Sequence, residues 1–411
     1  MIKKAKIAEY SFLSMFAVLP FLDFLSPVIL AITIVTGLLF KNQKDFFVLL
    51  KSQKVLLLLL LYFLLATLSL TYSTQLDETI TKLGRIIVFV LMPAAFLIIN
   101  PSLQLIKLAK RTFVFALILF CLFSLGKLIY HYIVDYEISH WYNFVQTSMY
   151  HKYIPEDAMF LNTGLVLVLF GRFKKYFKLF CTILFLIVIV LFGVRLGLFI
   201  YLLIISYYFI RNWKKLFSLK SVIIGIFTIL LCFFLIGNSR YVNDKFYDTL
   251  DKIGLGTKDR VSETGEEYHN IFLREKMWGA SYELILKRPI LGYGAGAERD
   301  ELANVYKKRG YSIPRHNAHN QLLSTTVQLG FLGLFIILGI FGMLLFKGIA
   351  QRNMKMNLII LVMAGSMITE SYLEIQQGLF YYCVFVCLLS YWQYQNEVLL
   401  NEASQPYIEV N

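Results

Sequence analysis

Cationic and imidazole side chains gather in the only long hydrophilic interval of the chain, residues 238–320. Arg274 and Trp278 lie near its middle, and His316 and His319 lie close to its end. An imidazole, with an unperturbed pKa of about 6.5, can take a proton from a hydroxyl group at neutral pH. A guanidinium can neutralise the phosphates of a glycosyl donor. Together these residue types suit a transferase that activates an acceptor hydroxyl, with His319 as the base.

Two other interpretations of the histidine segment remain open. Residues three apart, such as His316 and His319, can bind one metal ion, although no third ligand follows at a sensible spacing. Asn317 or Asn320 can instead cap a helix that begins here. The chain has no Asp-x-Asp pair of the kind that holds Mg²⁺ on a nucleotide sugar. We therefore expect neither a metal nor a cofactor.

A further cation, Arg195, interrupts an apolar sequence that runs from Tyr176 to Ile210. An arginine at membrane depth costs about 2.5 to 3.5 kcal/mol on insertion scales, so its side chain should face a cavity or a ligand. The structural alternative places it at the outer rim of the membrane, where it reaches the lipid headgroups. Glu370 and Glu374 flank a later turn and are candidates to pair with one of the arginines.

Three glycines, Gly292, Gly294 and Gly296, lie between Trp278 and His316 in the hydrophilic interval. No Gly-Lys-Ser/Thr follows them and no strand precedes them, which excludes a P-loop and a dinucleotide fold. We expect them to let the backbone turn closely against the helices. Tyr293 lies between two of them, and we count it with Trp278, His316 and Asn320 as a candidate substrate-binding residue.

The elements that must position these residues are membrane helices. Of the 411 residues, 58% are hydrophobic and 16% are charged, and the mean hydropathy is +0.64. The apolar residues form runs of about 18 to 22, a length that crosses the hydrocarbon core as a helix. We predict an all-α polytopic membrane protein with about twelve transmembrane helices. They cover approximately residues 8–22, 25–40, 55–71 and 79–99, a run ending near 134, 158–171, runs ending near 192 and 211, and 221–237, 321–346, 356–369 and 375–392.

The formal net charge of +14 comes from Lys and Arg at the ends of these runs. We interpret this charge as a topology signal and as contact with anionic membrane lipids, with no role for nucleic acid. Basic clusters occupy alternate loops, which predicts that both termini are cytoplasmic and that 238–320 faces outward. The predicted divisions are helices one to nine in 1–237, the outer loop in 238–320, helices ten to twelve in 321–392, and a cytoplasmic tail in 393–411. All five cysteines lie inside apolar runs, so no disulfide framework is expected.

The outer loop contains one strongly patterned segment. Leu273, Met277, Ala280 and Leu284 recur at intervals of three and four, which predicts an amphipathic helix from about residue 272 until Pro289 ends it. A second stripe, beside the apolar one, contains Arg274, Trp278 and Ser281. These three side chains can converge on one ligand. Such a helix is expected to lie along the membrane surface.

Taken together, these motifs resemble the O-antigen ligase and polymerase superfamily of bacterial envelopes. The resemblance rests on Arg274 followed by Trp278, on the segment from Pro289 to Gly294, and on the segment from His319 to Gly333. Arg195, which opens a helix after a short turn, is similar to the membrane arginine of that family. The motifs cover about residues 190–335, and the remaining helices agree only in number and hydropathy.

The resemblance implies a multi-pass glycosyltransferase of the bacterial inner membrane, metal-independent and inverting, with its site facing the periplasm. Its donor would be a glycan on undecaprenyl diphosphate. The acceptor would be lipid A-core for a ligase or a growing glycan for a polymerase, and we favour the ligase. Arg195 and Arg274 would hold the donor diphosphate, and His319, or His316 in its place, would act as the base.

The main alternative from another class is a twelve-helix transporter. Transporters built from repeats have matching halves with broken helices near the midplane. Here the long loop falls between the ninth and tenth predicted helices, and the halves do not mirror each other. A membrane scaffold without chemistry is a further alternative, which predicts no phenotype for Arg274→Ala or His319→Ala.

Overall fold

The computed structural model describes residues 2–21, 24–41, 46–134, 154–212, 270–311 and 313–404. Within these ranges the chain is helical and contains no strand, as predicted. It divides into two compact units. The first comprises Met1–Phe113 and Asn270–Asn411, and the second comprises Val114–His269. The polar groups of the outer segment that the structure describes all lie in the first unit.

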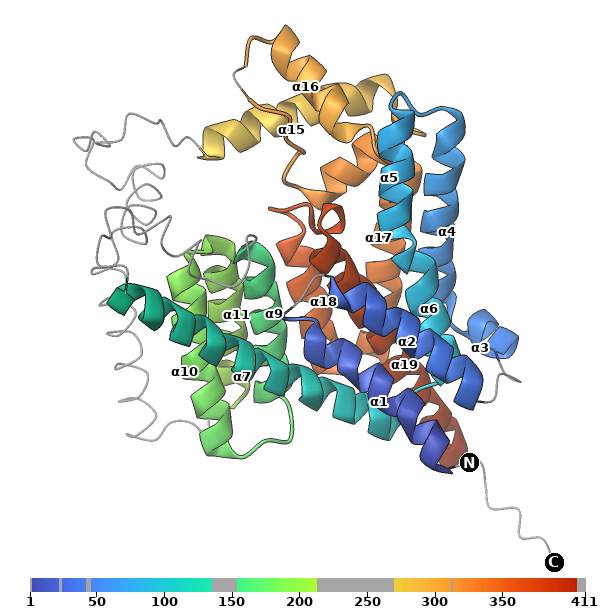
Figure 1. Ribbon diagram of the computed structural model, residues 1–411, viewed down its shortest axis with the longest axis vertical. Helices are drawn as coiled ribbons and strands as arrows, with labels where there is room; N and C mark the ends of the chain where they lie inside the picture. The colour runs from blue at the N-terminus through green and yellow to red at the C-terminus, as the bar shows by residue number, and fades with distance from the viewer. Residues whose placement is uncertain are drawn as a thin grey trace, which may run out of the picture. The chain divides into compact units, whose positions relative to one another are not determined.

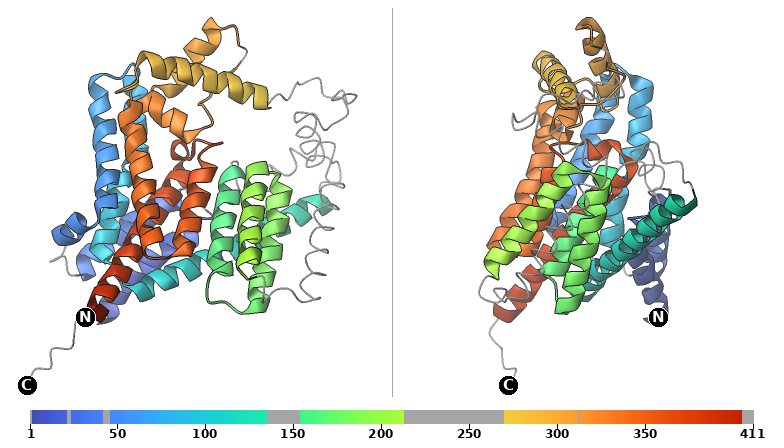
Figure 2. Two further views of the ribbon diagram at one scale, coloured as in Figure 1. Left: turned by 180° about the vertical axis from the view of Figure 1, so that it is seen from behind. Right: turned by 90° about the vertical axis from the view of Figure 1, so that its left-hand side faces the viewer.

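Helix α19 lies at the centre of the first unit, where residues 379–389 are all buried. In Figures 1 and 2, α4 and α17 run side by side, and α6 and α19 are also packed together. Its helices have these bounds: α1 Ile2–Val18, α2 Leu25–Phe40, α3 Phe46–Ser52, α4 Lys54–Leu68, α5 Leu76–Ile86, α6 Val88–Ile99, α7 Leu103–Val134, α15 Asn270–Lys287, α16 Glu298–Lys308, α17 Gln321–Ala350, α18 Met354–Ser366 and α19 Gln376–Ser404. Short 3-10 turns, η1 and η2, occupy Ser69–Thr71 and Tyr372–Glu374. Helix α7 continues into the second unit.

The second unit packs α9 against two neighbours, α10 and α11. These helices span Ile154–Leu169, Lys175–Phe192 and Arg195–Arg211. The turn between α10 and α11 is minimal, because Gly193 adopts a left-handed conformation that ends one helix only two residues before the next begins. This turn places Arg195 at the first position of α11, as the sequence predicts.

Five helices of the described ranges are long and apolar enough to cross a membrane. They are Lys54–Thr71, Leu76–Ile99, Leu103–Tyr130, Lys175–Phe192 and Gln321–Ala350, and Leu25–Phe40 and Met354–Ser366 are apolar but shorter. Each predicted span coincides with one helix, except that 79–99 covers two successive helices, α5 and α6, and that 221–237 lies outside the described residues. The number of membrane crossings and the outward position of the loop stay predictions.

Three details differ from the sequence prediction. The short helix α3 occupies part of a segment expected to be loop, and α19 extends to Ser404, so the predicted tail begins as helix. Helix α16 lies in the outer segment and was not predicted. Its sequence has Glu298, Asp300 and Glu301 in the first turn and Lys307 and Lys308 in the last, which matches the helix dipole.

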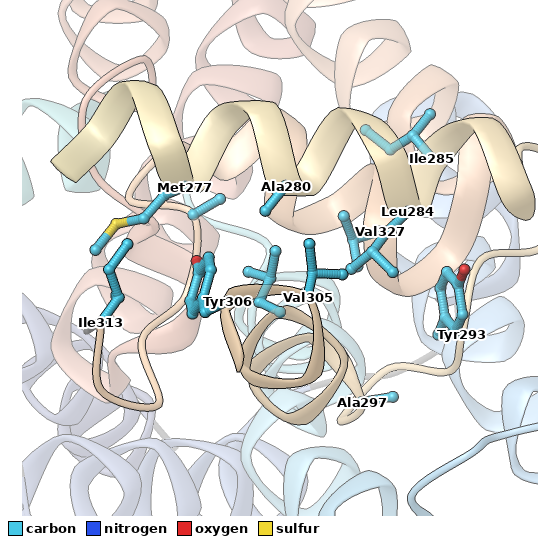
Figure 3. Packing of buried hydrophobic residues seen from close by; sticks show 12 residues of the cluster. Met277, Ala280, Leu284, Ile285, Tyr293, Ala297, Val305, Tyr306, Ile313 and Val327 are labelled. Atoms are coloured by element: carbon cyan, nitrogen blue, oxygen red, sulfur yellow. The ribbon is translucent and has the colours of Figure 1, made fainter. Parts of the chain in front are cut away.

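The predicted amphipathic helix is confirmed as α15, which ends two residues before Pro289. Met277, Ala280 and Leu284 are buried and face α16, where Tyr306 and other apolar side chains complete a small core (Figure 3). This core also includes Val327 of α17. It therefore fixes the two outer helices onto the end of a candidate membrane helix.

Helix α17 is broken at Gly330, whose φ of 63° and ψ of −166° suit only glycine. The chain from Pro289 to Gly294 lies against the break and forms hydrogen bonds with the backbone groups of α17 that lose their partners there. The N–H groups of Tyr293 and Gly294 donate to the carbonyls of Val327 and Gln328, over 3.0 and 2.9 Å. The N–H of Phe331 donates to Pro289 O over 2.7 Å. The backbone polar groups freed by the break are thereby satisfied.

The predicted role of the glycines is confirmed by this packing. A Cβ atom at Gly294 would collide with Ser73, and one at Gly296 would collide with the backbone of α5. Close approach allows Ala295 N–H to donate to Ser69 Oγ over 3.1 Å. The segment is thus clamped between α17 and the corner that joins α4 to α5.

Candidate active site

Arg274 and His319 meet at one carboxylate, that of Glu370. Nη2 of Arg274 donates to Oε1 of Glu370 over 2.7 Å. Nδ1 of His319 lies 2.9 Å from Oε2 of the same group. The side chains of Arg274 and His319 are each about one-third exposed, at 35% and 33%, so a ligand can reach them. Three segments distant in the sequence therefore converge on an accessible polar site.

The contact with Glu370 determines what the imidazole can do. A neutral ring that donates its Nδ1–H to a carboxylate carries an unprotonated Nε2. That nitrogen can accept a proton, and the carboxylate then stabilises the imidazolium. The pairing expected between Glu370 and an arginine is confirmed, and the structure adds the histidine to it. Glu374 pairs with Lys82 of α5 instead.

The backbone around His319 is held in a left-handed conformation, with a φ of 47°. This conformation costs a residue other than glycine about 1 to 3 kcal/mol. Hydrogen bonds on both sides maintain it: His319 N–H donates to Asn317 Oδ1 over 3.2 Å, and Asn320 N–H donates to Ser371 Oγ over 3.1 Å. Asn320 also accepts from two backbone N–H groups in the first turn of α17, which confirms the predicted helix cap. The imidazole is thereby fixed directly in front of the helix.

Trp278 contacts the same turn from the other side. Its indole N–H donates to the carbonyl of Ala318 over 3.0 Å, and the N–H of Ala318 donates to Oε1 of Glu298 over 2.9 Å. Glu298 is almost fully buried, with 1% of its surface exposed. The backbone of Ala318, the residue before His319, is therefore tied to α15 through Trp278 and to α16 through Glu298.

A buried polar network lies behind this turn. Glu298 accepts from the hydroxyl of Ser324 over 2.6 Å and from the amide of Gln328 over 2.7 Å. The same amide donates to Glu374 over 2.9 Å, and Glu374 pairs with Lys82. Burial, and then the charge of Glu374, raise the pKa of Glu298. Burial raises the pKa of Glu374 as well, but Lys82, Gln328 and Arg299 together outweigh it and the net shift is downward.

Residues 180–346 match the family model described as O-antigen ligase. This region belongs to the O-antigen ligase superfamily. A search of curated proteins gives no significant match. The matched residues include Arg195, Arg274 and His319, whereas Lys82, Glu370 and Glu374 lie outside them. The match supports an O-antigen ligase or polymerase role of the glycosyltransferase kind, and the long apolar helices are those expected of a multi-pass membrane protein.

Within the O-antigen ligase region, the structure brings His316 and His319 together, with ring centroids 5.8 Å apart. Partial burial lowers the pKa of His316, and the neighbouring charges of His319 and Arg299 lower it further. His316 therefore favours its neutral form and stays a second candidate for the base. Arg299 itself is exposed on the first turn of α16, so positive charge is available beside both rings.

Two predicted contacts take structural positions instead. Tyr293 is buried in the core beneath α15, and the guanidinium of Arg288 lies 4.8 Å from the centre of its ring (Figure 3). Ser281 is fully buried, and its hydroxyl donates to Met277 O within α15. Helical spacing placed Ser281 on the same stripe as Trp278, but α16 covers that position. Neither residue is included in the site proposed below.

Arg195 belongs to the second unit, where it begins α11 with its side chain partly buried. The adjacent helix α9 approaches closely: Asn162 donates to the carbonyl of Gly197 over 2.9 Å. Its convergence with Arg274 on one ligand stays a prediction.

Sequence reasoning missed Glu298, Gln328 and Lys82. Lys82 carried a usable signal, because it is a charged residue inside a predicted membrane span and meets the same criterion as Arg195. Glu298 and Gln328 carried none, since a glutamate in a polar segment and a glutamine in a helix are ordinary residues. Only the packing of α16 on α17 makes them neighbours.

Proposed function

We propose that this protein is an O-antigen ligase that works at the periplasmic face of the bacterial inner membrane. It transfers a glycan from undecaprenyl diphosphate to a sugar hydroxyl of lipid A-core. The observation that carries the proposal is the pair of contacts from Arg274 and His319 to the two oxygens of Glu370. A cation for the leaving diphosphate thereby lies beside a base for the acceptor hydroxyl.

In the proposed reaction, Nε2 of His319 takes the proton of the acceptor hydroxyl while its oxygen attacks the anomeric carbon of the donor. The bond between that carbon and the diphosphate oxygen breaks, and undecaprenyl diphosphate leaves with the electron pair. Attack opposite to the leaving group inverts the anomeric configuration. Arg274 stabilises the charge that develops on the diphosphate without a metal ion.

Glu370 has a different partner at each stage of this reaction. In the ligand-free protein it holds both Arg274 and His319. A bound diphosphate draws Arg274 toward itself because it offers more negative charge and more acceptor oxygens than one carboxylate. Glu370 then contacts His319 alone and stabilises the imidazole as it gains its proton. Substrate binding and stabilisation of the imidazolium are coupled through this one residue.

The proposal is tested in a strain that lacks the gene and is complemented with single variants. Wild type should restore a ladder of glycan on lipid A-core, seen when envelope glycolipids are separated on a gel. Arg274→Ala, His319→Ala and Glu370→Ala should leave bare core and an excess of full-length lipid-linked chains. Arg309→Ala is the matched control, because that arginine forms an exposed ion pair with Glu283 away from the imidazoles.

Two outcomes would contradict the proposal in different ways. A strain without the gene that makes core capped by one repeat would identify a polymerase, which uses the same donor with a growing glycan as acceptor. A full ladder from His319→Ala would remove that residue as the base. Repeating the second test with His316→Ala would show whether the two histidines exchange roles.

A further inference from the structure

Two lysines from different helices lie over the same indole ring at the opposite end of the first unit. Nζ of Lys110, in α7, is 3.1 Å from the centre of the Trp392 ring, and Nζ of Lys355, in α18, is 6.0 Å from it. Trp392 belongs to α19 and is buried, with 7% of its surface exposed. Three helices therefore bring two ammonium groups to one aromatic face.

A third lysine lies close to these two. Lys107 lies one turn before Lys110 along α7, and its side chain is exposed. In the ranges that the structure describes, no carboxylate forms an ion pair with Lys107 or Lys110. The nearest acidic side chain along α19, Glu397, is paired with Lys347 at 3.1 Å.

The first turn of helix α18 also lies beside these lysines. Lys355 is its second residue, so the positive end of the helix dipole lies beside the lysines. The side chain of Asn353 accepts from Met356 N–H, but the first N–H groups of a helix need further acceptors. Converging N–H groups and ammonium groups form the usual receptor for a phosphate oxygen.

We propose that Lys107, Lys110 and Lys355 bind the phosphate of an anionic phospholipid against Trp392. The ligand is a lipid rather than a soluble phosphate because apolar surface adjoins the cations on both helices. Leu108 of α7 and Leu361 of α18 are exposed at 45% and 54%, and each lies within two helical turns of a lysine of the site. An acyl chain covers such side chains, whereas a soluble anion leaves them bare. Basic clusters between helices at the predicted cytoplasmic side suit anionic headgroups.

The test measures binding of defined lipids to the purified full-length protein by native mass spectrometry. Phosphatidylglycerol should remain bound while phosphatidylcholine is lost. Lys110→Gln combined with Lys355→Gln should weaken retention of phosphatidylglycerol roughly tenfold or more, since each lysine near a headgroup contributes measurably to binding. Lys54→Gln is the matched control, because it removes an exposed lysine of the same unit that does not belong to the proposed site. Lys54 begins α4 and follows Gln53, whose side chain accepts a hydrogen bond from Ser390 of α19.

A second arm separates the lipid from other phosphates and from misfolding. Thermal melts with added inorganic phosphate should match those without it, whereas phosphatidylglycerol should raise the melting temperature of wild type. If the double variant does not fold, Lys107→Gln replaces it, because that side chain is exposed, and it should weaken retention several-fold. Equal retention of the two lipids, retention unchanged in the variants, or protection by inorganic phosphate would each overturn the proposal. None of these results depends on glycosyl transfer.

Discussion

Nδ1 of His319 lies 2.9 Å from Oε2 of Glu370, a residue 51 positions further along the chain. This contact fixes the ring and its tautomer, and it leaves one nitrogen able to accept a proton. Because the other oxygen of Glu370 accepts from Arg274, the carboxylate sets the relative position of the base and the cation. Glu370 is therefore the residue whose replacement best tests the site.

Glu370→Gln should lower kcat by about 100-fold or more. A glutamine has one acceptor oxygen, so it cannot serve Arg274 and orient the Nδ1–H of His319 at once. Transfer would be measured with purified protein, a lipid-linked donor and a defined acceptor. Glu275→Gln, an exposed change on the next residue to Arg274, is the control and should leave kcat unchanged. A drop of less than about threefold in Glu370→Gln would show that the carboxylate is not needed to orient the ring.

Glu298→Gln should be much better tolerated than Glu298→Ala. The raised pKa of Glu298 means that its neutral form is favoured by burial, so a neutral isostere keeps the shape and most hydrogen bonds. Alanine leaves Ala318 N–H and Ser324 without their acceptor and should destabilise the protein by about 2 to 4 kcal/mol. Denaturation followed by fluorescence compares the two, with Glu301→Ala on the same helix as control. Equal losses in both variants would show that the ionised carboxylate is what the network requires.

Gly330→Ala should destabilise the break in α17 by about 3 kcal/mol or more. The φ and ψ of this residue suit only glycine, and an added Cβ would also collide with the carbonyl of Ile290. Gly342→Ala, in the same helix with open space around its Cα, is the control and should be neutral or slightly stabilising. Melting temperatures in one detergent measure both. A Gly330→Ala protein as stable as Gly342→Ala would mean that α17 can straighten.

The attachment of α15 to α16 should weaken in acid. Glu283 bonds Lys287 at 2.7 Å and Arg309 at 2.7 Å, and these partners lower its pKa to about 2 from the ordinary value of 4.5. A lowered pKa in the folded state stabilises it above pH 4.5, and this contribution is lost as the pH falls toward 2. The difference in melting temperature between wild type and Glu283→Gln should therefore shrink from pH 5 to pH 2. Glu275→Gln should show no such trend, and a difference independent of pH would assign the effect to packing.

The sequence was sufficient for the helical class and for the helix that carries Arg274. Long apolar runs leave no alternative to helices in a membrane, and the three-and-four spacing of Met277, Ala280 and Leu284 defined both the extent and the buried face of α15. The capping role of Asn320 was also within reach, because an asparagine before an apolar run is a common helix start.

The remaining features depend on contacts between distant segments. Glu298 gains its role only because α16 packs on α17, and a hydrophobic pattern does not report which polar residue becomes buried. Ser281 was expected to reach a ligand and is instead buried. Spacing along one helix shows which residues share a stripe, but it does not show whether a neighbouring helix covers that stripe. Tyr293 was counted as a candidate binding residue because it lies between two glycines, and the sequence does not report that its side chain packs into the core beneath α15.

The internal carboxylate at Arg274 also defines which anions the site rejects. An anion with a single negative charge, such as chloride, gains little by replacing Glu370, because it exchanges one ion pair for another. Only a guest with several charges, held in addition by its lipid tail, has enough advantage to displace it. In the ligand-free protein Glu370 thus competes for Arg274, and it keeps abundant small anions out of the site of the scarcer lipid-linked diphosphate.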